Sequence, residues 1–198
     1  MEAARRRGEA ALAGHRGDEE KARSFLDDPD PQVRSSALGA LVRLGRATPE
    51  DAASALADPD PSARRYACEL GAALVGASFV ELLGDTDEAV VEAACFAVGE
   101  VQDLSAVPAL VAIATGHDDA LCRESAVAAL GAIGDPSGLE AVLAALYDKP
   151  QVRRRAAVAL AAFDTPESEA ALRRCLHDAD WQVRQAAEDQ LGISGEDG

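Results

Sequence analysis

The sequence predicts an all-α protein, a right-handed α-solenoid of stacked antiparallel helix pairs. Three observations support this fold class. A unit of about thirty residues recurs along the 198-residue chain, apolar residues in each unit follow a helical spacing, and no run of alternating β-branched residues indicates a strand. Aromatic residues make up only 4% of the chain, whereas Ala and Leu are abundant. The core is therefore expected to consist of small side chains on helices.

Each unit contains one helix with the same set of apolar positions. We define as its anchor the residue before the motif arginine or its equivalent, which gives Val33, Ala63, Val90, Cys122, Val152 and Val183. Four residues after every anchor stands alanine, and eight residues after it stands Leu or Val, except for Gly71 in the second unit. These spacings fall on one stripe of a helix. The sequence therefore predicts helices, here called motif helices, that begin near residues 31, 61, 88, 119, 150 and 181.

Start and stop signals flank these helices. Asp30-Pro31 and Asp60-Pro61 each supply a capping carboxylate followed by proline at the first helical position. Shorter second helices are predicted between the motif helices, because RATPEDAASAL and FDTPESEAALRRCL share the start signal Thr-Pro-Glu. The segments VQDLSAVPALVAIA and GDPSGLEAVLAAL fill the same slot in the third and fourth units. Glycines stand where helix ends need a left-handed residue, at Gly45, Gly134 and Gly192.

The repeats predict a single domain over residues 1–192. Residues 1–26 are expected to form a partial N-terminal unit, in register with the segment about thirty residues downstream. Residues 193–198 are expected to form a flexible acidic tail. Helices this short are marginal in isolation and become stable by stacking on their neighbours.

The pattern D-x-D-P-x-V-R-x-x-A-A-x-A-L-G, followed by D-P-x-A-V-P-A-L, resembles the short HEAT-like repeat of the phycobilisome-lyase type. The segments DPDPQVRSSAL, RESAVAALGAIGDPSGLEAVLAAL and DADWQVRQAAEDQLG carry this resemblance, which extends over about residues 1–192. It implies an armadillo-like solenoid of about six to seven units.

The resemblance also implies a structural role for the Asp and Arg of the motif. In the family the Asp lies in the turn, the Arg lies one helical turn later, and stacked units form a ladder of charge-assisted hydrogen bonds. The third unit has Asp85 but Val91 in place of arginine, so the ladder is expected to weaken there. The matching residues are Asp28 and Arg34, Asp58 and Arg64, Asp118 and Arg123, Asp148 and Arg153, and Asp178 and Arg184.

Composition and motifs exclude several kinds of function. The formal net charge of −16 repels phosphate backbones and argues against nucleic-acid binding. The four cysteines form no C-x-x-C pair and are expected to be buried thiols, and His15, His117 and His177 lack metal-ligand spacing. No apolar stretch reaches membrane-spanning length. We therefore expect a cytoplasmic protein with no cofactor, no metal, no catalytic residue and no membrane contact.

The resemblance places the V-R helices along the concave face of the solenoid, where their exposed positions would bind a partner. Two and six residues after each anchor the residue type varies between units, as expected for a site on a constant scaffold. Phe96 is an aromatic residue at such a position, and it is either a binding anchor or packed into the neighbouring repeat. The predicted partner-binding residues are Arg65, Tyr66, Glu69, Glu92, Phe96, Glu100, Glu124, Arg154 and Val158.

Two functions fit these features. The leading hypothesis is a non-enzymatic scaffold or adaptor that binds a protein partner. A partner with a basic segment is favoured by the carboxylates Glu69, Glu92, Glu100 and Glu124. The alternative, which rests on the resemblance alone, is a phycobilin lyase-like subunit that acts on a tetrapyrrole chromophore-protein. End-to-end self-association is also expected, because MEAARRR is a poor cap for a stack of helices, and light scattering at two concentrations tests it.

Overall fold

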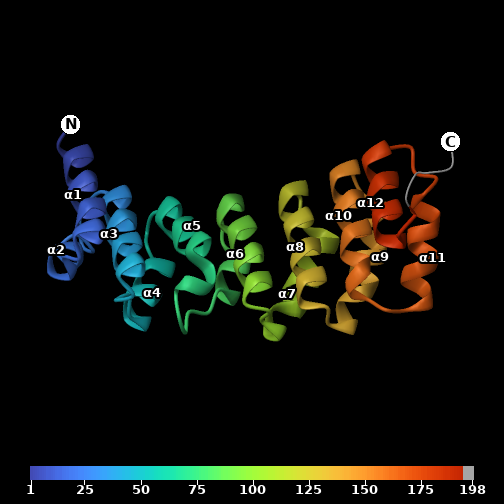
Figure 1. Cartoon of the computed structure of the whole chain (residues 1–198), viewed down its shortest axis with the longest axis horizontal. Helices are drawn as coiled ribbons and strands as arrows, with labels where there is room; N and C mark the ends of the chain where they lie inside the picture. The colour runs from blue at the N-terminus through green and yellow to red at the C-terminus, as the bar shows by residue number, and fades with distance from the viewer. Residues whose placement is uncertain (194–198) are drawn as a thin grey trace. The chain divides into compact units, whose positions relative to one another are not determined.

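The chain folds into helices throughout its described part. The computed structural model describes residues 1–193, which form twelve α-helices and five short 3₁₀-helices and contain no strand (Figure 1). This confirms the all-α fold class that the repeats predict. The motif helices are α3 (Pro31–Leu44), α5 (Pro61–Leu70), α6 (Glu88–Glu100), α8 (Ala120–Ile133), α10 (Pro150–Ala159) and α12 (Trp181–Leu191). The other helices are α1 (Glu2–Arg16), α2 (Glu19–Arg23), α4 (Pro49–Leu56), α7 (Val107–Gly116), α9 (Leu139–Ala145) and α11 (Pro166–Cys175).

Side-chain caps determine where the motif helices begin. The carboxylate of Asp30 accepts hydrogen bonds from the backbone N–H groups of Gln32 and Val33, at 2.9 and 3.3 Å. Pro31 occupies the first helical position, where its missing N–H leaves no hydrogen bond unmade. Carboxylates in the same position cap α5, α8 and α12, from Asp60, Asp119 and Asp180.

Glycines end several of the helices. Gly45, Gly134 and Gly192 follow α3, α8 and α12 with φ angles of 63°, 69° and 66°. This left-handed conformation strains residues that carry a Cβ. The sequence prediction for these three glycines is therefore confirmed.

The segment after α5 contains no second α-helix. It forms two 3₁₀-helices, η1 (Gly71–Ala73) and η2 (Val80–Gly84). Phe79, directly before η2, is 1% exposed and heads the fully buried side chains by volume. In this repeat, the ring of Phe79 therefore supplies much of the apolar surface that a second helix supplies in other repeats.

The core consists of the predicted apolar stripe. At the eighth position after the anchor, Leu41, Val98, Leu130 and Leu160 are at most 1% exposed. Small residues at the fourth position allow the helices to approach closely, and all of them are completely buried. These residues are Ala37, Ala67, Ala94, Ala126, Ala156 and Ala187.

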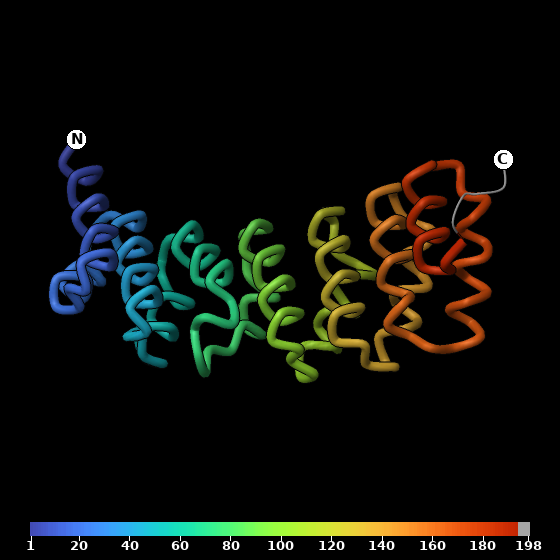
Figure 2. The backbone as a smooth tube through the Cα atoms, in the orientation of Figure 1, coloured from blue at the N-terminus to red at the C-terminus, as the bar shows by residue number. Residues whose placement is uncertain are grey.

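The chain divides into two compact units, Met1–Ala97 and Val98–Gly198, called unit 1 and unit 2 below. In unit 1, α3 packs against α1 and α5, and in unit 2, α10 packs against α8 and α12. Within each unit the backbone alternates between motif helices and the shorter segments that connect them (Figure 2). A single solenoid over residues 1–192 stays a prediction. Of the predicted tail at 193–198, residues 194–198 lie outside the described part of the chain.

Among residues 1–193, no helix combines the length and the apolar character that crossing a membrane requires.

Candidate functional site

Arginines of successive helices form a ladder of ion pairs within each unit. Arg34 donates from Nε and Nη2 to the two carboxylate oxygens of Asp58, at 2.7 and 2.6 Å. Its Nη1 donates to the carbonyl oxygen of Asp28, at 2.7 Å. Each such arginine thus joins the turn of its own repeat to the carboxylate of the next repeat. The same bidentate geometry, with distances of 2.6–3.2 Å, joins Arg6 to Asp28, Arg64 to Asp85, Arg123 to Asp148 and Arg153 to Asp178.

Two predicted ladder residues lack this side-chain pairing. Val91 is buried at the position where the other repeats have arginine. Asp118 accepts a hydrogen bond from Arg123 through its carbonyl oxygen, at 2.9 Å, and its side chain forms no ion pair within residues 1–193. Arg184 donates to the carbonyl oxygen of Asp178, at 2.8 Å, and has no carboxylate partner in the described part of the chain. Among residues 1–193 the ladder is therefore complete at five arginines, it is interrupted at Val91, and the side chains of Asp118 and Arg184 take no part in an ion pair.

The ion pairs shift the titration of the ladder carboxylates. Hydrogen bonds from the arginines hold the pKa values of four of them below the usual range, at Asp28, Asp85, Asp148 and Asp178. At Asp58, burial alone would raise the pKa. Hydrogen bonds from Arg34 and from the backbone N–H of Asp60 outweigh this effect, and the pKa is lowered.

These pKa shifts predict loss of stability in acid. A carboxylate with a lowered folded-state pKa stabilises the protein above its unfolded-state pKa of about 4, and this contribution is lost as the pH falls through the folded-state value. We expect a thermal midpoint that is nearly level from about pH 7 to 5 and falls steeply below about pH 4. Circular-dichroism melts over this range measure it. A midpoint that falls mainly between pH 7 and 5 would contradict the role given to the ladder.

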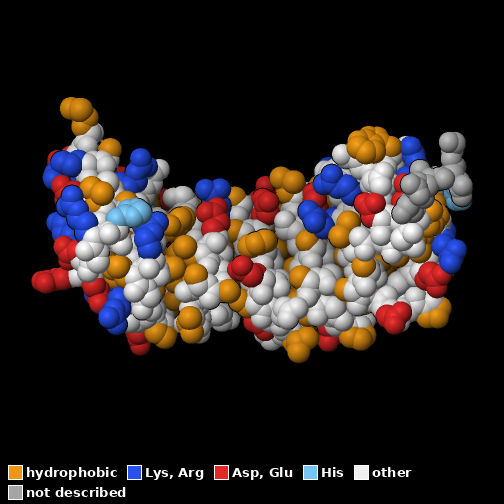
Figure 3. Space-filling view, in the orientation of Figure 1, with side chains coloured by type: hydrophobic (Ala, Val, Ile, Leu, Met, Phe, Trp, Pro, Cys, Tyr) orange, Lys and Arg blue, Asp and Glu red, His pale blue; other side chains and the backbone are white. Residues whose placement is uncertain are grey.

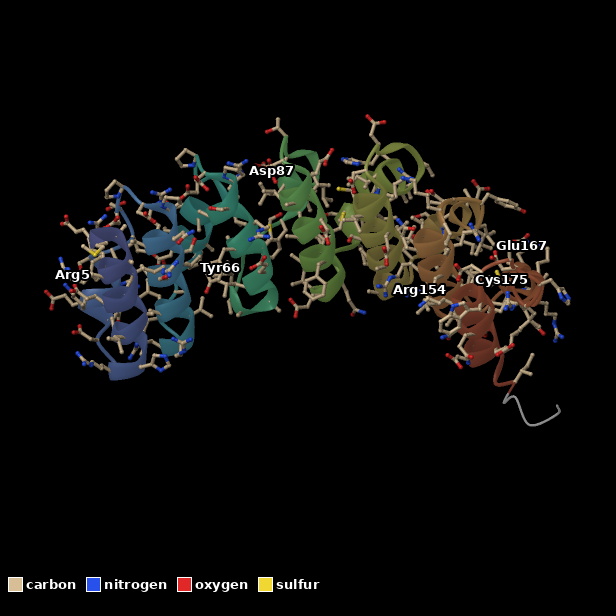
Figure 4. The ribbon with its side chains drawn as sticks, turned by 90° about the horizontal axis from the view of Figure 1, so that it is seen from above. Arg5, Tyr66, Asp87, Arg154, Glu167 and Cys175 are labelled. Atoms are coloured by element: carbon tan, nitrogen blue, oxygen red, sulfur yellow. The ribbon has the colours of Figure 1, made fainter. Side chains whose placement is uncertain are left out.

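The exposed side of the motif helices varies in character, and we call it the motif face of each unit. It comprises residues two, three and six positions after the anchors. In unit 1, a Cβ added to Gly39 of α3 would collide with the hydroxyl of Tyr66 on α5. Figure 4 labels Tyr66 on this unit. Gly39 therefore leaves the space that the Tyr66 ring occupies. Beside it, Nε of Arg65 lies 3.5 Å from Oε1 of Glu69, and both side chains are about half exposed.

Phe96 is the most exposed aromatic residue of the motif face in unit 1. Its side chain is 62% exposed although it lies on a helix whose neighbouring positions, Ala94, Cys95 and Ala97, are completely buried. The alternative that Phe96 packs into a neighbouring repeat is therefore wrong. Glu92 lies one turn earlier on the same helix and is partly exposed. An apolar ring next to a carboxylate is thus presented to solvent in unit 1.

The motif face of unit 2 has a different charge. Oε1 of Glu124 on α8 lies 3.7 Å from Nη2 of Arg154 and 3.4 Å from Nη2 of Arg155, both on α10. Two guanidinium groups thus face one carboxylate, and Val158 beside them is 41% exposed. Figure 4 shows Arg154 on the side of unit 2 opposite to Glu167 of α11. The expectation that Glu124 contributes to an acidic surface is wrong, because the arginines neutralise it.

Each unit also contains a groove. One, in unit 1, has a volume of about 730 Å³, and its walls include the Arg34–Asp58 ion pair of the ladder together with Leu38. Another, in unit 2, has a volume of about 350 Å³ between α9 and α11 and is lined by Tyr147 and Arg174 among others. Tyr147 is 83% exposed. It provides a matched aromatic residue outside the motif faces for the experiments below.

The described residues offer few groups for catalysis. No set of three or more His, Cys, Asp or Glu side chains among residues 1–193 is arranged to hold a metal ion. The four cysteines are buried and unbridged. Burial raises the pKa of the Cys68 thiol to about 12 and also raises that of Cys175. Neither thiol is thus prepared to act as a nucleophile at neutral pH.

Two residues with clear roles escaped the sequence prediction. Arg6 forms the first rung of the ladder, at 2.7 Å from Asp28, and its position 28 residues before Arg34 was the available signal. Arg6 stands in a run of three arginines, Arg5–Arg7, so the sequence does not distinguish it from its neighbours. Lys and Arg side chains also gather over the N-terminal helices in the structure (Figure 3). Arg155 contacts Glu124. The sequence could have indicated this residue, because it stands three residues after its anchor, as the predicted binding residue Tyr66 does.

Comparisons with known proteins place this arrangement among repeat proteins. No curated protein sequence matches the chain. A chain of the complex of CpcE and CpcF of phycocyanin lyase from Nostoc sp. PCC7120 is similar with 25% identity and a TM-score of 0.63, over 88% of this chain and 76% of that chain. A designed armadillo repeat protein in complex with peptide (KR)4 has 19% identity and a TM-score of 0.66, over 87% of this chain and 97% of its own. Human deoxyhypusine hydroxylase in complex with glycerol has 22% identity and a TM-score of 0.53, over 94% of this chain and 78% of its own.

The family follows from the sequence match. The model of HEAT repeats matches residues 76–151 and 145–198, which together exceed half of the chain. The likeness to the phycocyanin lyase complex agrees with the motif resemblance, and the likeness to the armadillo protein agrees with the helical repeat fold. The chain belongs to the HEAT repeat family.

Proposed function

We propose that this HEAT-repeat chain is a non-enzymatic scaffold whose motif face in unit 1 binds a segment of a partner protein in the cytoplasm. The observation that carries the proposal is the 62% exposure of Phe96 on α6. Most of this ring therefore lies outside the core of the repeat. At the equivalent position the other motif helices have Gly39, Glu69, Ala128, Val158 and Asp189.

The chemistry around Phe96 supports a particular kind of segment. An exposed aromatic ring can bury a large apolar area at small entropic cost, and such residues often contribute most to binding. Glu92 is on the same helix, and no ion pair of this carboxylate occurs among the described residues. A segment that places an apolar side chain on Phe96 and Lys or Arg near Glu92 would satisfy both groups.

The fold is compatible with this use. The designed armadillo repeat protein of similar fold is in complex with the peptide (KR)4. That likeness concerns the arrangement of helices, while the proposal for this chain depends on its own exposed residues. Phe96 and Glu92 define the class of partner segment.

Selection from a displayed peptide library on the immobilised chain tests the proposal. We expect the selected peptides to combine Lys or Arg with an apolar residue. Binding to the Phe96→Ala variant should be weaker by about tenfold or more, because a hot-spot ring is lost. Raising the salt concentration from about 0.05 M to 0.5 M should also weaken binding, since the charged groups are exposed.

The Tyr147→Ala variant is the matched control, because it removes an exposed aromatic ring outside the motif faces. It should bind the selected peptides as the wild type does. Peptides that bind Phe96→Ala and wild type equally well, or that lose affinity with Tyr147→Ala, would refute the assignment of the motif face.

A second candidate function is a phycobilin lyase-like subunit. The observation that favours it is the 25% identity to a chain of the phycocyanin lyase complex over 88% of this chain. Mixing the protein with a bilin and recording the visible spectrum tests it. A shifted absorption band would support the candidate, and an unchanged spectrum would remove it.

A further inference from the structure

The two arginines of the unit 2 motif face are held more loosely than the ladder arginines. Each ladder guanidinium makes two hydrogen bonds to a carboxylate, at 2.6–3.2 Å. Arg154 and Arg155 instead share one oxygen of Glu124, at 3.7 and 3.4 Å. Charge-assisted hydrogen bonds are normally shorter than these contacts. Glu124 therefore neutralises the pair without saturating it.

Both guanidinium groups are also open to solvent on one side. The side chains of Arg154 and Arg155 are 39% and 41% exposed, whereas Glu124 is only 13% exposed. The nearest further contact of Arg154 is a long hydrogen bond of 3.5 Å to Gln182 of α12. Two positive groups and one partly buried negative group leave a local charge of about +1 on a strongly acidic chain.

Arg155 has a buried donor without a partner. Its Nε is shielded from solvent and makes no hydrogen bond, and it is the one such side-chain atom found among residues 1–193. Leaving a buried charged donor unpaired is costly, so a conformation that pairs it is favoured when an acceptor is supplied. This observation is independent of the loose contact with Glu124.

We propose that Arg154 and Arg155 form a subsite on the motif face of unit 2 that holds an oxyanion, a carboxylate or phosphoryl group, of a partner protein. The idea rests on the proposed function only in assigning the oxyanion to a partner protein. On binding, the exposed Arg155 side chain turns its Nε and Nη2 edge toward the incoming oxygens, and Arg154 adds a second donor group. The orphan Nε is then paired, and Glu124 is displaced from the two guanidinium groups.

Arginine side-chain NMR on the ¹⁵N-labelled full-length protein tests this subsite with inorganic phosphate as the probe. The Nε–Hε signals of the two arginines are assigned by their loss in Arg154→Lys and Arg155→Lys. At constant ionic strength, we expect both signals to shift saturably with phosphate, while the signals of Arg34 in the ladder and of the exposed Arg43 do not. Shifts of the pair that are absent, or no more saturable than those of Arg43, would overturn the proposal.

A variant of Glu124 and a second anion provide two further tests. Glu124→Gln removes the internal competitor and should tighten phosphate binding about fivefold, whereas Glu69→Gln in unit 1 should leave it unchanged. Unchanged affinity in Glu124→Gln would also overturn the proposal. Acetate as a second probe distinguishes the source: binding of both anions indicates an acidic side chain, and binding of phosphate alone indicates a phosphorylated residue. Peptide selection on Phe96 uses neither arginine, so the two proposals fail separately.

Discussion

Replacing Asp58 by alanine is expected to destabilise the protein by about 2–4 kcal/mol, because removing one partner of a buried ion pair leaves the other charge unpaired. The Asp58 side chain is 8% exposed and that of Arg34 is 18% exposed. Two hydrogen bonds to Arg34 disappear, and the backbone N–H of Asp60 loses its acceptor. Chemical denaturation followed by circular dichroism measures the change.

Asp118→Ala provides the matched control for this prediction. Asp118 occupies the corresponding turn of a later repeat, but its side chain has no ion pair within residues 1–193 and it is exposed. Its replacement should change the free energy of unfolding by no more than about 0.5 kcal/mol. Equal losses from Asp58→Ala and Asp118→Ala would show that the turn, rather than the ladder, provides the stabilisation.

Replacing Gly131 by leucine is expected to cost about 3 kcal/mol, the upper range for overpacking a tight core. A Cβ at this position would lie 2.7 Å from Cβ and 2.9 Å from Cα of Ala159. The second of these atoms belongs to the backbone of α10, so relief requires the two helices to separate. Thermal and chemical denaturation measure the loss.

Gly8→Leu is the control, since a Cβ at Gly8 would have no atom of another element within 4 Å. Leucine has a higher helix propensity than glycine, by about 0.8 kcal/mol, so the stability of this variant should be unchanged or slightly higher. Opposite signs at two helical glycines would identify helix approach as the cause. Destabilisation of similar size at both positions would exclude that explanation.

Features that depend on local chemistry were predictable from the sequence. The Asp30 cap and the left-handed Gly45 each depend on a few consecutive residues, and the structure has both. The buried stripe of alanines was visible because the same constraint recurs in every repeat, as at Ala37 and Ala126. Repetition makes such a pattern readable without an alignment, since each unit is compared with the others.

Features that depend on contacts between helices were harder to predict. In the sequence motif, the Asp and Arg of one repeat stand together, as Asp28 and Arg34 do. In the structure, the side chain of Arg34 forms its ion pair with Asp58 of the next repeat. Glu124 looked like a free carboxylate because its two arginine partners lie about thirty residues later, on α10. The distance between stacked helices decides both contacts, and that distance is not encoded in any single repeat.

The central claim, that the motif face is the binding surface, is tested most directly by capture of cellular partners with three matched baits. Wild type, Phe96→Ala and Tyr147→Ala are immobilised at equal amounts and the bound proteins are quantified by mass spectrometry. We predict a set of proteins that is retained by wild type and Tyr147→Ala and lost from Phe96→Ala. The same proteins on all three baits, or losses confined to Tyr147→Ala, would contradict the claim.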